Sequence, residues 1–227
     1  MNAFFNKYKL FITTLFVLSC IIITLFYNIL NPVIVLPIYQ PAQVNYELVD
    51  STIQHQKKYH HIADFSLINQ NGDTITQAFY KDKIYVADFF FTTCSTICPR
   101  MTSQMKRLNS MTEDISEHLQ FISFSINPKY DGPSQLKKYK ANHGIKAKNW
   151  VFLTGDEVET HRIGIEEFRI FAGQDDMAED GYAHSEAFTL VDKEGYVRGV
   201  YNIQDPQQVD QMNKDIRKLL EIEYGIK

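Results

Sequence analysis

The hydrophobic pattern of the chain changes sharply near its N-terminus. Lys7 and Lys9 are followed by no charged residue until Glu47, and residues 10–30, LFITTLFVLSCIIITLFYNIL, are almost wholly apolar. A helix of this length spans about 30 Å, which matches the hydrocarbon thickness of a bilayer. A core helix of a soluble domain normally carries a polar face, and this stretch has none. The pattern therefore predicts a short cytoplasmic N-terminus at residues 1–9 and a membrane-spanning helix at residues 10–30.

The charges beside this helix predict its orientation. Lysines precede it and none follows it closely, which places the N-terminus in the cytoplasm and the rest of the chain outside. A cleaved signal peptide fits less well, because the apolar stretch is long and no A-x-A site follows it. Cys20, in VLSC, loosely resembles a lipoprotein box and leaves a lipid anchor as the alternative. No Arg-rich transit segment precedes the helix, so we expect a bacterial inner membrane, crossed once, with the C-terminal domain facing the periplasm.

Residues 31–58 separate this helix from the remainder of the chain. They contain Pro32, Pro37 and Pro41 and then become polar. Such a composition is typical of an extended spacer. We expect residues 31–58 to be a tether and residues 59–227 to be one folded domain.

Within residues 59–227, short apolar runs alternate with stretches that have helical spacing. The pattern predicts hairpins at 62–79 and 185–203, strands at 83–91, 119–126 and 149–155, and helices at 100–111, 134–144, 156–171 and 206–224. Strands that alternate with helices and end in an antiparallel hairpin predict an α/β domain, with a mixed central sheet flanked by helices. In such sheets functional residues gather just beyond the carboxyl ends of the strands.

Composition and charge exclude two classes of protein. The formal net charge is -4 and no long run of like charges occurs, so the basic face of a nucleic-acid-binding protein is missing. Three cysteines, one of them inside the apolar stretch, do not form the framework of a disulfide-rich fold. One pair of cysteines is left to explain.

That pair is Cys94 and Cys98, in FFFTTCSTICP, between a predicted buried strand and a predicted helix. Residues four apart at a helix start bring their sulfurs together, and a helix N-terminus favours the thiolate. Three interpretations stay open: inert buried thiols, a redox-active dithiol, and two ligands of a soft ion such as Cu(I) or Zn²⁺. His184, in the loop that precedes the late hairpin, is the candidate for a third metal ligand.

The segments DFFFTTCSTICP and AHSEAFTLVDKEG together resemble the Sco/SenC family of membrane-anchored copper proteins, over about residues 59–222. The resemblance implies a thioredoxin-like fold and a copper site formed by Cys94, Cys98 and His184. It also implies a role in maturing the copper centre of cytochrome c oxidase. That role is copper delivery to the copper-bearing subunit or another copper-transfer protein, reduction of its thiols, or both. The chain departs from the family at Ser95 and Ala183, where Pro and Asp are common, and keeps all three implied ligands.

A second resemblance concerns redox chemistry. Asp88 precedes Cys94 by six residues, the spacing of the buried acid in thioredoxin, and is a candidate proton acceptor for the dithiol of Cys94 and Cys98. A membrane-tethered thiol-disulfide oxidoreductase is therefore the main alternative function, and a sensor that transfers nothing is a third. No proline occurs between Pro133 and Pro206, where thioredoxins carry the proline that docks their substrates. Its absence favours metal binding in an assembly factor over general reductase activity.

Overall fold

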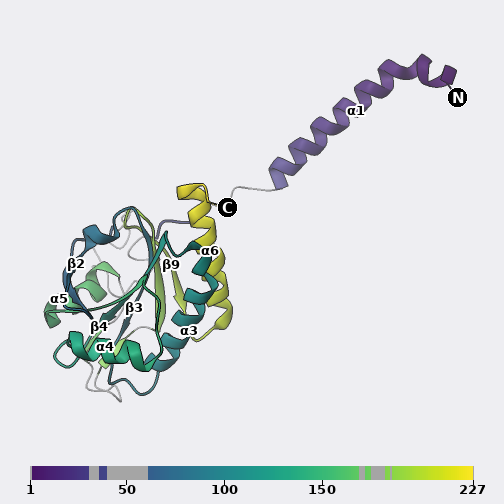
Figure 1. Cartoon of the computed structure of the whole chain (residues 1–227). Coiled ribbons are helices and arrows are strands. Elements are labelled where there is room, and N and C mark those ends of the chain that lie inside the picture. Colours follow the sequence, from purple (N-terminus) through teal and green to yellow (C-terminus); the bar gives the residue numbers. More distant parts are fainter. Residues whose placement is uncertain are drawn as a thin grey trace. The chain divides into compact units, whose positions relative to one another are not determined.

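The computed structural model of the chain describes residues 2–30, 36–39, 61–168, 172–174, 182–184 and 186–226. It divides into two units, residues 1–35 and 36–227. The first unit contains α1 (Asn2–Leu30), drawn in purple in Figure 1. The window Lys7–Tyr27 of α1 is long and apolar enough to cross a membrane, and the protein buries none of it. A single helix thus covers the predicted span at residues 10–30.

The second unit is an α/β domain. Its strands are β1 (Ser66–Asn69), β2 (Thr74–Thr76), β3 (Ile84–Phe90), β4 (Leu119–Ser125), β5 (Trp150–Thr154), β6 (Ala172–Gln174), β7 (Tyr182–His184), β8 (Ala187–Val191) and β9 (Val197–Asn202). Its α-helices are α3 (Cys98–Met111), α4 (Pro133–Asn142), α5 (Glu157–Arg162) and α6 (Pro206–Tyr224). Single 3-10 turns lie at Gln77–Tyr80 and Glu113–Ile115.

Seven of these strands form one mixed sheet in the order β2-β1-β5-β4-β3-β8-β9. β3, β4 and β5 are parallel, whereas β1 and β8 run antiparallel to their neighbours β5 and β3. β6 and β7 form a separate two-stranded antiparallel sheet. α3 and α6 pack against each other, and α6 lies along β9 (Figure 1). The mixed sheet flanked by helices is the predicted arrangement.

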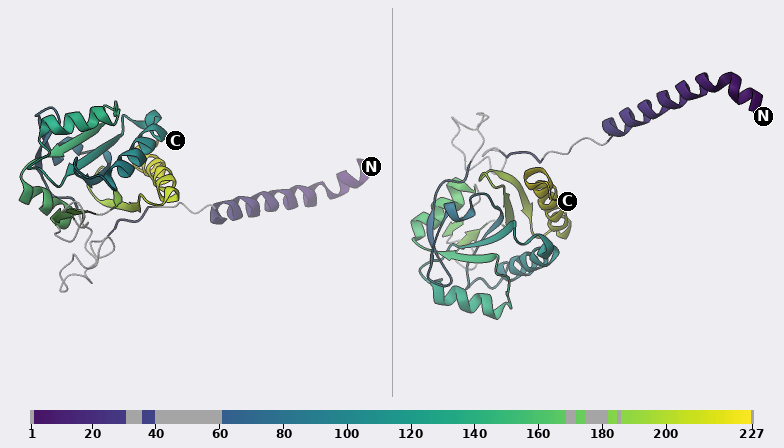
Figure 2. Two further views of the ribbon diagram at one scale, coloured as in Figure 1. Left: turned by 90° about the horizontal axis from the view of Figure 1, so that it is seen from below. Right: turned by 45° about the horizontal axis from the view of Figure 1, so that its top comes forward.

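The inner strand β3 is buried on both faces because nearly all of its side chains are apolar. Alternate residues point to opposite faces, so Phe90 packs on Tyr139 of α4 while Phe89 packs on Phe168, which follows α5. The strands accordingly run between α4 and α5 in the left view of Figure 2. Asp88 lies two residues before Phe90 and therefore shares the face covered by α3 and α4.

The helix predicted at residues 156–171 is an α-helix only in its first part, and residues 169–171 lie outside the described residues. Asp156 caps α5 by accepting a 3.0 Å hydrogen bond from the backbone N–H of Glu159, but the α-helix ends at Arg162. A π-helical turn follows at Ile163–Glu167. The extra residue of this turn directs the carboxylate of Glu167 inward, where it accepts hydrogen bonds from the backbone of Ala63 and from Arg162.

The segment Leu36–Tyr39 is attached to the domain, although it lies within the predicted tether. The Leu36 side chain is 7% exposed and belongs to the hydrophobic core. The backbone N–H of Tyr39 donates to the carbonyl of Val197 in β9 over 2.8 Å. Leu36–Tyr39 therefore belongs to the domain, and the rest of the predicted tether, residues 31–35 and 40–58, lies outside the described residues.

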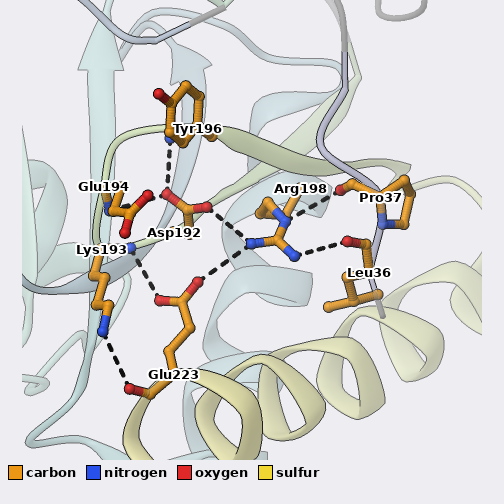
Figure 3. A network of polar contacts seen from close by, with 8 residues as sticks. All are labelled: Leu36, Pro37, Asp192, Lys193, Glu194, Tyr196, Arg198 and Glu223. Atoms are coloured by element: carbon orange, nitrogen blue, oxygen red, sulfur yellow. Dashed lines mark hydrogen bonds and ion pairs between the residues drawn. The ribbon is translucent and has the colours of Figure 1, made fainter. Parts of the chain in front are cut away.

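A buried arginine fixes this segment (Figure 3). Arg198 of β9 donates to the carbonyl oxygens of Leu36 and Pro37, at 2.7 and 3.1 Å. Its guanidinium also forms ion pairs with Asp192 at 2.9 Å and with Glu223 of α6 at 3.3 Å. We call these three charged side chains the Arg198 clamp.

Candidate metal and redox site

The topology places both cysteines at the carboxyl edge of the parallel strands. β3 ends at Phe90, and α3 begins at Cys98 with Pro99 in its first turn, where a missing N–H costs no hydrogen bond. Cys94 lies in the connecting loop. The predicted strand–loop–helix context is therefore the observed one, and the loop sits where sites of such sheets form.

The two thiols are close to each other and differ in exposure. Both cysteines are reduced, and Cys94 is 7% exposed whereas Cys98 is fully buried. The backbone N–H of Cys98 donates to Cys94 Sγ over 3.3 Å, and Thr96 Oγ1 lies 3.8 Å from the same sulfur. The sulfur of Cys94 thus sits against the N-terminus of α3, where the helix dipole and an N–H donor stabilise negative charge.

Cys98 has the opposite electrostatic setting. Its hydrogen bond with Cys94 raises the pKa of the Cys98 thiol well above its ordinary value, burial raises it further, and the charge of Asp88 adds to the effect. The Cys98 thiol therefore keeps its proton in neutral solution. A soft metal ion can displace that proton, because metal binding and thiol deprotonation are coupled.

Asp88 lies close to the dithiol. It is 2% exposed, stands in β3 opposite Ser123 of β4, and its charge raises the pKa values of both Cys98 and Tyr139. The structure therefore brings the candidate proton acceptor onto the face that carries the start of α3. The predicted grouping of Asp88 with the cysteines follows from the alternation of side chains along β3.

His184 occupies a strand rather than the loop expected from the sequence. It is the last residue of β7 and pairs with Ala172 of β6. Three-residue strands such as AGQ and YAH are too short to show an alternating pattern, which is why the pairing was not predicted. The His184 side chain lies outside the described residues. Within the described side chains, no three His, Cys, Asp or Glu groups are clustered closely enough to hold a metal ion.

Sequence reasoning missed Asp131, which contacts the cysteine loop. This residue is fully buried in the turn between β4 and α4, and its carboxylate accepts a hydrogen bond from the backbone of Thr92, two residues before Cys94. In the sequence it belongs to NPKYDGP, which indicates only a turn. His161 of α5 lies near the same edge, with Nε2 2.9 Å from the carbonyl oxygen of Ile126.

The amino-acid sequence is similar to those of a known protein family and of a curated relative. The SCO1/SenC family model matches residues 53–221. The SCO1 protein homolog of Bacillus subtilis is 33% identical over 157 residues, which is 69% of this chain and 81% of that protein.

Two solved structures share the fold. BsSco, described as a member of the Sco family of cytochrome c oxidase assembly proteins with a disulfide switch, is 32% identical with a TM-score of 0.63, covering 71% of this chain and 94% of that chain. ScoI of Bradyrhizobium japonicum with copper bound has a TM-score of 0.57 at 22% identity, covering 67% of this chain and 97% of that chain, and shows the fold alone. The domain has the thioredoxin-like fold that the sequence resemblance implied.

Proposed function

The chain belongs to the SCO1/SenC family, and we propose that it binds one copper ion and assists the maturation of the copper centre of cytochrome c oxidase. The ligands in this proposal are Cys94, Cys98 and His184. The observation that carries it is the pair of reduced cysteines at the N-terminus of α3, with Cys94 Sγ 3.3 Å from the Cys98 backbone nitrogen. Copper would be cargo, passed to the copper-bearing oxidase subunit or to another copper-transfer protein.

The chemistry of the donors fits this metal. Thiolates are soft ligands that suit Cu(I), and an imidazole added to two thiolates also suits Cu(II). Because Cys94 is slightly exposed and Cys98 is buried, copper would reach the pair from the side of Cys94. The putative copper-binding protein of Stutzerimonas stutzeri, 27% identical to this chain over 164 residues, supports the choice of copper over zinc.

The length and apolar composition of α1 support a membrane location. An apolar helix that the protein does not bury is stable in lipid and unfavourable in water. We propose that α1 is a single-pass anchor in a bacterial inner membrane, with residues 36–227 on the periplasmic side.

The second candidate function is thiol-disulfide exchange, which the position of Asp88 favours. Cys94, as the more exposed thiol, would attack a disulfide of an exported protein and form a mixed disulfide. Cys98 would then attack Cys94 Sγ, and its proton would pass by way of the Asp88 carboxylate to the substrate sulfur that leaves. The proton of the Cys94 thiol would go to the first substrate sulfur, so the substrate is released as a dithiol. Two electrons leave the Cys94–Cys98 pair and two reduce the substrate, so the exchange balances.

Substitution of His184 separates the two functions. His184→Ala removes a copper ligand and leaves both thiols, so copper binding should weaken strongly while the dithiol chemistry continues. The S–Cu(II) charge-transfer absorption should fall or shift, because two thiolates can hold Cu(I) in a linear arrangement but not Cu(II). His161→Ala is the matched control, because that imidazole is bonded to the carbonyl of Ile126 at the same edge of the sheet.

The decisive measurement is oxidase activity in cells whose only copy carries His184→Ala, His161→Ala, Cys94→Ser or Cys98→Ser. The copper function predicts that the His184 and both cysteine variants lose oxidase activity and that His161→Ala keeps it. Normal oxidase activity with His184→Ala, together with loss in the cysteine variants, would reject copper carriage and support thiol-disulfide exchange.

A further inference from the structure

The carboxylate of Asp131 joins three segments around the cysteine loop. Its Oδ2 accepts hydrogen bonds from the backbone N–H of Thr92 at 2.9 Å and from Ser125 Oγ at 2.6 Å. Its Oδ1 accepts a hydrogen bond from Thr92 Oγ1. Gln135 of α4 donates to the same threonine oxygen over 3.2 Å. The loop after β3, the end of β4 and the start of α4 therefore meet at one side chain.

This carboxylate is held by neutral donors only. Asp131 is fully buried, and among the described residues no Lys, Arg or His forms an ion pair with it. A buried charge without a counter-ion is costly unless hydrogen bonds replace the water that it loses. Here two hydroxyl groups and one backbone N–H do so, which makes the carboxylate sensitive to any change in their positions.

Asp131 is connected to the cysteines through Thr92 and the backbone of the loop that follows it. Thr92 follows Phe91, whose carbonyl accepts a hydrogen bond from the backbone N–H of Cys94 at 3.3 Å. On the other side, Cys94 Sγ accepts from the N–H of Cys98, the first residue of α3. The loop is thus fixed on one side by Asp131 and on the other by the helix, with Cys94 between the two points.

We propose that Asp131 is a positioning residue that fixes Thr92 and thereby holds Cys94 Sγ against the N-terminus of α3. The inference rests on the proposed function, in which Cys94 and Cys98 hold copper or exchange a disulfide. Without this carboxylate, the loop would open locally and the sulfur of Cys94 would no longer stay at one distance from Cys98.

Asp131→Asn in the full-length protein, purified in detergent, tests this role. The amide keeps the shape of the side chain but turns an NH₂ group toward a donor of Thr92 or Ser125. In the reduced, metal-free protein we expect alkylation of Cys94 by iodoacetamide to speed up severalfold. In the copper-loaded protein we expect the S–Cu(II) absorption to broaden and shift, and copper affinity to fall about 10–100-fold, as for the loss of other partners of metal ligands.

Three further variants separate positioning from a general loss of stability. Thr92→Val removes the hydroxyl, keeps the backbone N–H, and should reproduce part of the effect even if Asp131→Asn folds poorly. Thr92→Ser restores the hydroxyl and should behave like the wild type. Asp192→Asn alters another buried carboxylate that accepts two backbone N–H groups, from Glu194 and Tyr196. It should lower the unfolding temperature while leaving the alkylation rate and the copper absorption unchanged.

The two kinds of readout also separate this inference from the proposed function. If wild-type protein binds no copper, the proposed function fails, and the alkylation rates still test the role of Asp131. If Asp131→Asn and Thr92→Val both keep the wild-type alkylation rate and the wild-type copper absorption, Asp131 does not position Cys94. The same conclusion follows if Asp192→Asn alters the cysteines as much as Asp131→Asn does.

Discussion

Removal of the arginine from the Arg198 clamp should destabilise the domain strongly. Arg198→Met keeps most of the side-chain volume and deletes the charge between two buried carboxylates, Asp192 and Glu223, whose side chains are 2% and 9% exposed. Asp192 Oδ1 would still accept from two backbone N–H groups, but its Oδ2 would lose its partner. Breaking a buried ion pair from one side costs about 3–5 kcal/mol. For a domain of this size that corresponds to a fall in Tm of about 6–20 °C.

The stability lost in Arg198→Met should depend on pH, and the ionisation of Glu223 determines whether the loss grows or shrinks as pH rises. Burial raises the pKa of Glu223, the charge of Asp192 raises it further, and Arg198 lowers it. Because the folded pKa of Glu223 lies above its unfolded value, the contribution of Glu223 to stability is greatest at low pH and is lost as pH rises through the folded pKa. Deleting Arg198 raises that pKa more. The penalty of Arg198→Met should therefore be larger at about pH 8 than at about pH 5, because a larger fraction of Glu223 is protonated at the lower pH and a protonated Glu223 does not repel Asp192.

Urea unfolding of protein that lacks residues 1–30 measures both effects. The matched control combines Arg198→Met with Asp192→Asn and Glu223→Gln, which removes all three charges and keeps the oxygen atom that accepts from Glu194 and Tyr196. Neutral replacement of a whole buried ionic group is often tolerated, so the triple variant should recover more than half of the lost stability. The reasoning would be contradicted if the free energy of unfolding of Arg198→Met lay within about 1 kcal/mol of the wild-type value. It would also be contradicted if Arg198→Met lost as much stability at pH 5 as at pH 8.

Two other predictions concern the anchor and the dithiol. Full-length protein should sediment with membranes, and protein lacking residues 1–30 should be soluble; uncleaved full-length protein in the soluble fraction without detergent would exclude a membrane anchor at α1. Oxidation of Cys94 and Cys98 to a disulfide removes both thiolates, so reduced protein should bind about one copper and release protons, while oxidised protein should bind none. Equal copper content in the two forms, measured by metal analysis beside a thiol count, would exclude the pair as ligands.

The parts of the fold that the sequence predicted are those specified by local pattern. The strands expected at 83–91, 119–126 and 149–155 became β3, β4 and β5 with ends shifted by one residue or less, because continuous apolar runs bounded by polar turns have few other conformations. The helix expected at 206–224 is α6, whose start is fixed by Pro206 and by Asp205, which accepts from the N–H of Gln207. The location of the cysteine loop was predicted in the same way, because the loop joins a predicted strand to a predicted helix.

The features that were not predicted depend on residues distant in sequence. Arg198 and Leu36 are 162 positions apart, and no local pattern shows that a guanidinium in β9 will bind carbonyl oxygens of the segment after α1. Asp131 and Thr92 are 39 positions apart, and Glu167 and Ala63 are 104 apart. In each case a polar side chain is buried because a specific distant partner satisfies it, and such a pairing becomes visible only when the chain is folded.

These distant contacts also relate the proposed site to the attachment of the N-terminal segment. Val191 at the end of β8 pairs with Tyr85 at the start of β3, so the Arg198 clamp lies at the end of β3 opposite Phe90 and the cysteine loop. Seven residues of strand, about 20 Å, separate the two ends. Leu36–Tyr39 and the clamp can therefore hold the domain at one end of the sheet without contacting Cys94 at the other. In the proposed function, in which Cys94 and Cys98 pass copper or electrons to a partner, this separation keeps the attached segment away from the reacting thiols.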